Sequence, residues 1–190
     1  DDALHRLQSI NAHTRNIEDR YWLEVGWVRV WLELLNECQR RGETVFFGGT
    51  DVSDTEKNDT WVWNGNDWSQ RLPANSPTLR QGHVMVYDGS RQRVLLFGGW
   101  DGGSTHHNDT WEWDGVNWSP LSPASKPSTR REHAMAYDTA RGRAVLFGGW
   151  NGSTRSNETW EFDGNNWLKP TPMAAPTARA AHAMAYDAWR

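Results

Sequence analysis

The sequence predicts an all-β fold built from repeated four-stranded units, with a helical extension at the N-terminus. Three short motifs support this prediction, because each recurs at an interval of 50 residues or one residue less. The motifs are Phe-Gly-Gly at residues 47–49, 97–99 and 147–149, Arg-x-x-His from Arg80, Arg130 and Arg179, and Asn-(Asp/Glu)-Thr-Trp from Asn58, Asn108 and Asn157. A fixed period of this length indicates a repeat architecture, in which each unit buries its apolar face against the next.

The composition narrows the classes of protein to consider. The length of 190 residues fits one domain, or one domain with an appendage. Fourteen Trp residues argue against disorder, because disordered chains are poor in aromatic residues. A net charge of -4 gives no reason to expect nucleic acid or an anionic membrane as partner. No apolar run approaches the roughly 18 residues of a membrane-spanning helix.

Cysteine usage and the first residue add two expectations. Cys38 is the only cysteine, which excludes an intrachain disulfide framework and a Cys-based zinc site. The chain begins with Asp1 rather than Met and shows no signal peptide, so we expect an N-terminus that is processed or cut from something longer. The compartment stays open.

Residues 1–40 do not share the repeat and are predicted to be helical. Between Ile17 and Cys38, apolar residues recur three or four positions apart, as on one face of a helix. Gly42 is a plausible end for that helix. We expect the segment to replace the missing strand of the first unit, to pack across its open edge, or to form a separate element. Binding of a partner or a membrane surface is the functional alternative, although the polar face is not rich in Lys or Arg.

Residues 80–129 are the clearest repeat, and four strands are predicted in them. Residues 83–88 and 93–97 form two apolar strands joined by a turn, and paired glycines end the second. After a polar loop at residues 100–107, residues 109–113 alternate as a half-buried strand does. Asp114-Gly115 predicts a two-residue hairpin turn with both residues at positive φ. Residues 117–119 form the return strand, and Pro120, Pro123 and Pro127 are expected to stop further pairing.

Repeated units of four short antiparallel strands are typical of the blades of a β-propeller. Residues 43–79 supply three strands of a first blade, and residues 80–129 and 130–178 supply two whole blades. Residues 179–190 supply only the inner strand of a further blade, predicted at residues 182–187. Propellers carry about four to eight blades, so this segment does not close a ring by itself. Either the chain is a fragment of a longer propeller, or two chains pair head to tail as a homodimer with six blades.

Residues 41–190 resemble the kelch repeat family, and its bacterial style in particular. The matching residues are the paired glycines, the Arg-x-x-His openings and two sets of aromatic residues: Trp63, Trp113 and Phe162, then Trp68, Trp118 and Trp167. The first set departs from the family pattern, which usually has Tyr. The resemblance implies that the paired glycines end the second strand of each blade and that the first strand lines the central channel.

The resemblance also makes galactose oxidase, an enzyme built on a kelch-type propeller, a distant relative. Its copper site needs two Tyr, two His and a Tyr-Cys cross-link. Cys38 lies outside the clear repeats, so no site residue carries over. No phosphate-binding loop, nucleophile elbow or zinc-protease helix is present either. We therefore expect no catalytic residues, no cofactor and no metal.

The expected function is non-catalytic protein binding or scaffolding, carried by loops at one rim of the propeller. The loops after the paired glycines vary between repeats, at residues 50–57, 100–107 and 150–156. Their candidate binding residues are Trp100, Asp101, His106, His107, Trp150, Asn151 and Arg155. One alternative is a carbohydrate-binding propeller in which Trp100 and Trp150 stack on sugar rings. The other is a fragment of a galactose-oxidase-like enzyme.

The histidines are interpreted as structural. His106 and His107 are adjacent, but no third metal ligand is apparent. His83, His133 and His182 recur with the repeat, so we expect them to be hydrogen-bonded at the starts of strands. The alternative is a ring of these histidines and the recurring arginines that binds an anion in the channel.

Overall fold

The structure is a computed structural model that describes residues 42–189. The helix predicted for residues 1–40 lies outside the described residues. Residues from Thr44 onward form a compact unit made of strands, turns and loops, with no helix among the described residues. That part of the chain accordingly offers no helix that could cross a membrane.

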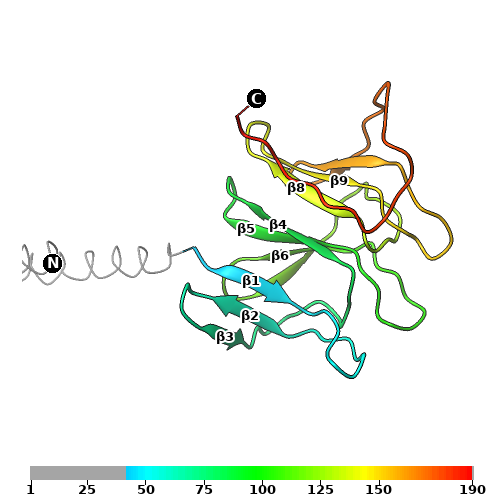
Figure 1. The fold of residues 1–190 in the computed structure, drawn as a ribbon. Coiled ribbons are helices and arrows are strands. Elements are labelled where there is room, and N and C mark those ends of the chain that lie inside the picture. The colour runs from blue at the N-terminus through cyan, green and yellow to red at the C-terminus, as the bar shows by residue number, and fades with distance from the viewer. Residues whose placement is uncertain (1–41, 190) are drawn as a thin grey trace, which may run out of the picture. The chain divides into compact units, whose positions relative to one another are not determined.

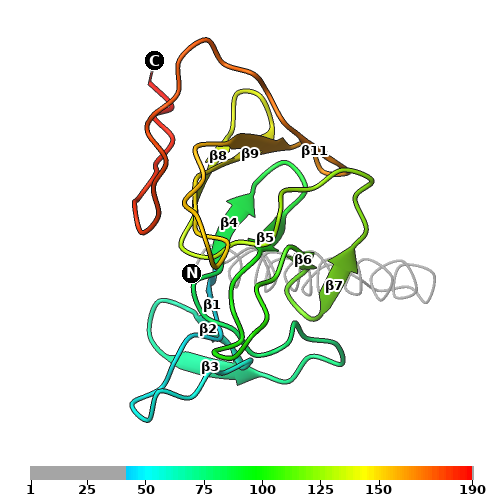
Figure 2. The same cartoon turned by 90° about the vertical axis from the view of Figure 1, so that its right-hand side faces the viewer.

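Eleven strands form three antiparallel sheets, each a meander in which consecutive strands pair. Figures 1 and 2 show the sheets following one another along the chain. The first blade contains β1 (Thr44–Phe47), β2 (Thr60–Trp63) and β3 (Trp68–Arg71). The second contains β4 (Val84–Asp88), β5 (Arg93–Phe97), β6 (Thr110–Trp113) and β7 (Trp118–Leu121). The third contains β8 (Ala134–Asp138), β9 (Arg143–Phe147), β10 (Thr159–Phe162) and β11 (Trp167–Leu168).

This arrangement confirms the predicted all-β fold of about three blades, the first with three strands. The core lies between the sheets, because alternate side chains of one strand face opposite neighbours. On β5, Leu96 packs with Phe47 of the first blade, whereas Leu95 and Phe97 pack with Leu146 of the third. All of these side chains are buried. The continuous apolar run of β5 is therefore explained by a blade on each side.

The paired glycines make room for the segment that opens the next repeat. Gly98 has a φ of +68°, and a Cβ there would lie 2.6 Å from the Arg130 carbonyl oxygen and 3.2 Å from the His133 ring. Gly99 has a φ of +106°, and its Cβ would lie 3.0 Å from the Cβ of His83. The second strand of a blade thus ends where two Arg-x-x-His segments approach its backbone.

The turn predicted at Asp114-Gly115 is wrong in type. Trp113 pairs with Trp118, so four residues connect β6 to β7 instead of two. Gly115 has a positive φ, but Asp114 does not. Its carboxylate instead accepts hydrogen bonds from the backbone N–H groups of Val116 and Asn117, at 2.8 and 2.7 Å. This side-chain turn competes successfully with the tighter hairpin.

Two strand boundaries also differ from the predictions. Pro120 does not stop pairing, because it lies within β7, opposite Trp111. β7 is the outermost strand of its sheet, where a proline can direct its missing donor away from the ladder. Residues 182–187 do not form the predicted strand. A strand needs a partner for its backbone groups, and none of the described strands pairs with this segment.

Candidate functional site

The loops that follow β1, β5 and β9 lie on one side of the sheets, the right-hand side in Figure 1. Each loop is ordered by the side chain that follows its first residue. The Asp101 carboxylate accepts hydrogen bonds from the backbone N–H groups of Gly103 and Thr105, at 2.9 and 3.0 Å. Asn151 holds the third loop in the same way, and Asp51 holds the first. These loops are thus shaped before any ligand arrives.

Two of the predicted binding residues therefore have a structural task. One oxygen of Asp101 and the amide oxygen of Asn151 are used inside their own loops. Loss of hydration raises the pKa of Asp101, but hydrogen bonds from the Thr105 and Gly103 backbone outweigh it and leave the pKa below its usual value. The carboxylate stays ionised at neutral pH.

Neighbouring loops touch one another. A Cβ on Gly102 would clash with the Glu56 carboxylate, and a Cβ on Gly152 would lie 3.1 Å from the His106 ring. The first loop therefore rests on the second, and the second rests on the third. Together they form one continuous rim surface.

At the centre of this surface lies a cluster that we call the rim stack, composed of Trp100, His106, Arg131 and Trp150. The Arg131 guanidinium lies over both indole rings, 4.2 Å from the centroid of Trp100 and 4.6 Å from that of Trp150. The His106 ring is stacked on Trp100 at 6.1 Å and edge-on to Trp150 at 5.5 Å. Cation–π contacts of this kind contribute about 0.5–1 kcal/mol each where they are exposed.

Arg131 is the member of the rim stack that the sequence prediction missed. It follows the recurring Arg130 directly, and the equivalent residues in the other repeats are Gln81 and Ala180. The residue at this position differs between the repeats, whereas the Arg and the His of the Arg-x-x-His motif on either side of it are constant. This variation is the signal that could have indicated a place at the rim.

The two adjacent histidines are separated in the structure. His106 belongs to the rim stack, whereas the backbone of His107 bonds to Gly99 and Arg130. Burial and the charge of Arg80 lower the pKa of His107. Within residues 42–189, no three His, Cys, Asp or Glu side chains gather where they could hold a metal ion.

A polar pocket of about 250 Å³ lies beneath the third loop, and Asn151 and Arg155 are among its lining residues. Its floor includes the ion pair between Arg130 and Glu158, with 2.7 Å between Nη2 and Oε2. Burial raises the pKa of Glu158, but hydrogen bonds from Lys169 and Arg130 outweigh it and bring the pKa to about 2. The pocket thus combines a neutralised ion pair with the exposed guanidinium of Arg155.

Two of the recurring arginines each join the segment that opens a repeat to the later strands of the same repeat. Arg80 is fully buried and donates to both carboxylate oxygens of Asp109, at 2.6 and 2.9 Å, and to the Gly98 carbonyl at 3.0 Å. Arg130 makes the corresponding bonds to Glu158 and Gly148. Because these two guanidinium groups are already paired inside the protein, they are not available to an anion in the channel.

His133 does not form the predicted hydrogen bonds. Neither ring nitrogen has a hydrogen-bond partner among the described residues. The ring instead packs edge-on against Phe97, with 5.5 Å between centroids. Burial, together with the charge of Arg130, lowers the pKa of His133 to about 3, so the ring is neutral at physiological pH.

Comparison with known proteins gives one family. A family model described as the KLHDC2/KLHL20/DRC7 Kelch-repeats domain matches residues 37–189, a span that contains all the described strands. No curated protein matches the chain.

Proposed function

Because the chain belongs to the KLHDC2/KLHL20/DRC7 Kelch-repeats domain family, we propose that it is a non-catalytic protein-binding or scaffolding module whose rim loops contact the partner. Kelch-repeat domains are generally protein-interaction modules. The fold alone does not identify a partner, so the proposal depends on the chemistry of the rim.

The rim stack is the observation that carries this proposal. Trp and Arg are the residues that most often dominate the binding energy of protein interfaces. Two indole rings cover Arg131, so the guanidinium is fixed in place before binding and loses little freedom on contact. Its N–H groups are the natural donors to a carboxylate. We therefore expect a protein segment that presents an acidic side chain beside an apolar one.

The alternatives draw less support from the geometry. Sugar stacking on Trp100 and Trp150 needs a free ring face, and Arg131 occupies one face of each ring, so at most one face of each remains for a sugar. An oxidase needs a group of convergent metal ligands, and the described residues contain no such group.

Selection of peptides from a random displayed library on the immobilised chain tests the proposal. The wild-type chain should enrich peptides with Asp or Glu next to an apolar residue. Arg131→Glu should lose these peptides or enrich basic ones instead. Lys126→Glu is the matched control, because it makes the same change of charge at an exposed residue outside the three rim loops, and it should select the wild-type peptides.

Two results would contradict the proposed site. The first is enrichment of the same peptides by the wild-type chain and by Arg131→Glu. The second is no enrichment from the library combined with binding to a glycan array that Trp100→Ala abolishes, which would favour the carbohydrate alternative.

A further inference from the structure

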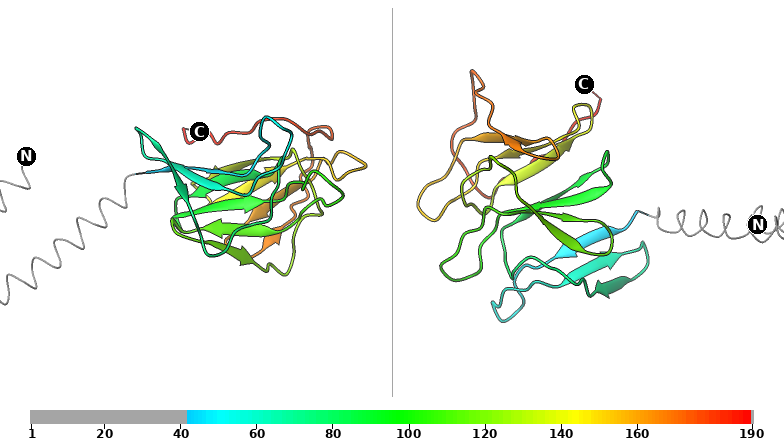
Figure 3. Two further views of the ribbon diagram at one scale, coloured as in Figure 1. Left: turned by 90° about the horizontal axis from the view of Figure 1, so that it is seen from below. Right: turned by 180° about the vertical axis from the view of Figure 1, so that it is seen from behind.

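We propose that the two ends of the described row of blades bind one another between two copies of this chain, so that two chains close a six-bladed ring. In Figures 1 and 3, β1–β3 and the C-terminal segment lie at opposite ends of the row. The contacts that complete each blade and join it to its neighbour repeat along the chain. At each end of the row, one partner of every such contact is present and the other is missing. The partner that is missing at one end is present at the other end.

The first repeated contact is made by a tryptophan on the outermost strand of a blade. Trp118 donates from Nε1 to the hydroxyl of Thr60 in the preceding blade, at 3.0 Å, and Trp167 donates to Thr110 at 3.0 Å. Both tryptophans are 0% exposed. Each ring also packs edge-on against a phenylalanine of the preceding blade, with 5.2 and 4.9 Å between centroids: Phe47 and Phe97.

At the ends of the row this contact is incomplete. Trp68 is the equivalent residue of the first blade, and it is 50% exposed. Thr159 and Phe147 are the equivalent partners in the third blade, and no tryptophan indole of the described residues contacts them as Trp118 contacts Thr60. Trp68 of one copy therefore fits Thr159 and Phe147 of a second copy.

The second repeated contact is an ion pair between a buried arginine and a partly exposed carboxylate. Arg80 binds Asp109, and Arg130 binds Glu158. Arg179 is the next arginine of the series, and among residues 42–189 its guanidinium bonds to the main-chain and side-chain oxygens of Thr177 alone.

The missing acid is present at the other end of the row. Asp59 aligns with Asp109 and Glu158, and its Oδ2 accepts a hydrogen bond from Trp61 at 2.6 Å, as theirs do from their tryptophans. Its Oδ1 is buried without a hydrogen-bond partner in the described part of the chain. A buried carboxylate oxygen in this state is costly unless a donor reaches it. Arg179 of a second copy is the donor that the repeat predicts.

The third repeated contact is strand pairing. β4 pairs with β5 so that Val84 lies opposite Phe97, and β8 pairs with β9 so that Ala134 lies opposite Phe147. β1 has no such inner strand in the described part of the chain, and residues 183–186 follow His182 as β8 follows His133. The same register places Ala183 opposite Phe47 of the second copy and Met184 opposite Phe46. This pairing removes an open strand edge, which is a liability in an isolated sheet.

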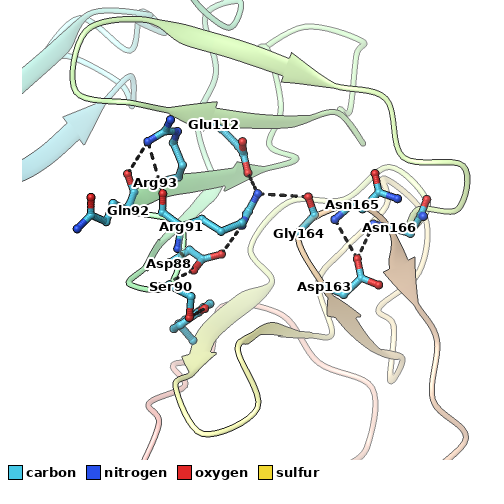
Figure 4. A network of polar contacts seen from close by, with 11 residues as sticks. Asp88, Ser90, Arg91, Gln92, Arg93, Glu112, Asp163, Gly164, Asn165 and Asn166 are labelled. Atoms are coloured by element: carbon cyan, nitrogen blue, oxygen red, sulfur yellow. Dashed lines mark hydrogen bonds and ion pairs between the residues drawn. The ribbon is translucent and has the colours of Figure 1, made fainter.

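The fourth repeated contact lies at the opposite rim, in the network of Figure 4. Arg91 bonds to Asp88 and Glu112 of its own blade and reaches the Gly164 carbonyl of the next blade at 3.2 Å. Arg141 makes the corresponding bonds to Asp138 and Glu161 in the third blade, where no next blade follows in the described residues.

A second copy is the occupant that these contacts favour. The N-terminal end offers an indole donor and a carboxylate, and the C-terminal end offers a hydroxyl acceptor and a guanidinium. Two copies give six blades, which lies within the range of about four to eight that propellers adopt. A two-fold axis repeats the junction, so both ends of both chains are satisfied.

A charge exchange between two variants tests the proposal. Asp59→Arg places two arginines at each junction, and Arg179→Asp places two carboxylates there. Each variant alone should dimerise about a hundredfold more weakly than the wild type, because facing like charges are strongly disfavoured. An equimolar mixture of the two should dimerise again, since every junction then holds one Arg and one Asp. Solution mass from multi-angle light scattering over a range of concentrations is the measurement.

Controls separate this result from misfolding. Lys126→Asp makes the same charge change as Arg179→Asp at an exposed residue away from both ends, and it should dimerise like the wild type. Trp68→Ala should weaken dimerisation while the chain still unfolds cooperatively on heating. A wild-type chain that stays monomeric overturns the proposal and leaves residues 1–41 or a further blade as the occupant. Dimers of either charge variant alone, or failure of the mixture to dimerise, overturn it too.

Discussion

Glycine is required at residue 98 for space as well as for backbone conformation. A side chain there would meet the Arg130 carbonyl, which is fixed by its hydrogen bond from Gly99 at 2.9 Å. Gly115 also has a positive φ, but a Cβ there would have nothing within 4 Å. Substitutions at residues 98 and 115 therefore distinguish the effect of a steric clash from the effect of backbone strain alone.

We expect Gly98→Ala to lower the free energy of unfolding by about 3 kcal/mol, because clash adds to strain. Gly115→Ala should lower the free energy of unfolding by only about 1 kcal/mol, because the alanine must adopt a left-handed backbone conformation without any clash. Urea unfolding followed by tryptophan fluorescence measures both. Equal losses would show that the space beside Gly98 is not limiting.

The buried histidines make stability depend on pH. The pKa of His133 is about 3 in the folded chain and near 6.5 in the unfolded chain. Below about pH 6.5 the unfolded chain thus binds a proton that the folded chain does not, so stability is complete above that pH and falls as the pH decreases. His83 adds to this effect, since burial lowers its pKa to about 4.

From pH 7 to pH 5, His133 should reduce the free energy of unfolding by about 2 kcal/mol. His133→Gln should therefore be less stable at pH 7 and should lose about 2 kcal/mol less than the wild type over the same interval. The half-buried His106 is the control, because His106→Gln should change the pH dependence less. Urea unfolding of the wild type and both variants at pH 7 and pH 5 measures these differences in the free energy of unfolding. An unchanged dependence in His133→Gln would mean that the ring is not buried in its neutral form.

At the scale of the element, the outer strand of the second blade contains a proline that pairs within the sheet. Pro120 lies opposite Trp111 in β7, and Gln70 lies opposite Trp61 in β3. Residues of an antiparallel pair alternate between bonded and non-bonded positions, and a proline fits only where its nitrogen faces away from the ladder.

Gln70→Pro should accordingly leave the thermal midpoint nearly unchanged. Ser69→Pro should lower the free energy of unfolding by more than about 1 kcal/mol, because the neighbouring position donates to the ladder. Differential scanning calorimetry of both variants is the measurement. Greater damage from Gln70→Pro than from Ser69→Pro would contradict the register of β3.

The repeat explains why most strands were predictable from the sequence. Each strand is supported by two or three copies of one pattern, so the predicted strands at residues 83–88, 93–97 and 109–113 agree with β4, β5 and β6 within a residue. The predicted turn was wrong at Asp114, because its carboxylate accepts backbone hydrogen bonds and stabilises a longer turn. The predicted end of pairing was wrong at Pro120, because an edge strand can accept a proline whose nitrogen faces away from the neighbouring strand. Arg131 escaped prediction because its role depends on two tryptophans that are distant in the sequence.

At the scale of the whole molecule, the described blades behave as a row with two unlike ends. Every junction uses the same tryptophan, arginine and inner strand, so a junction between chains needs no new chemistry. The same regularity means that residues 183–186 have the sequence of a strand, although they pair with none of the described strands. Their pairing with β1 of a second copy is the central claim about the assembly.

A register-specific disulfide tests that claim most directly. In a Cys38→Ser background, Phe46→Cys and Met184→Cys place two thiols opposite one another across the proposed pair, within the 4.4–6.8 Å between Cα atoms that a disulfide allows. Mild oxidation should give a covalent dimer linked between residues 46 and 184, identified by peptide mass spectrometry. The slipped variant, Phe46→Cys with Ala185→Cys, should cross-link far less, because its second thiol faces the other side of the strand. No 46–184 link, or equal cross-linking in the slipped variant, would contradict the account.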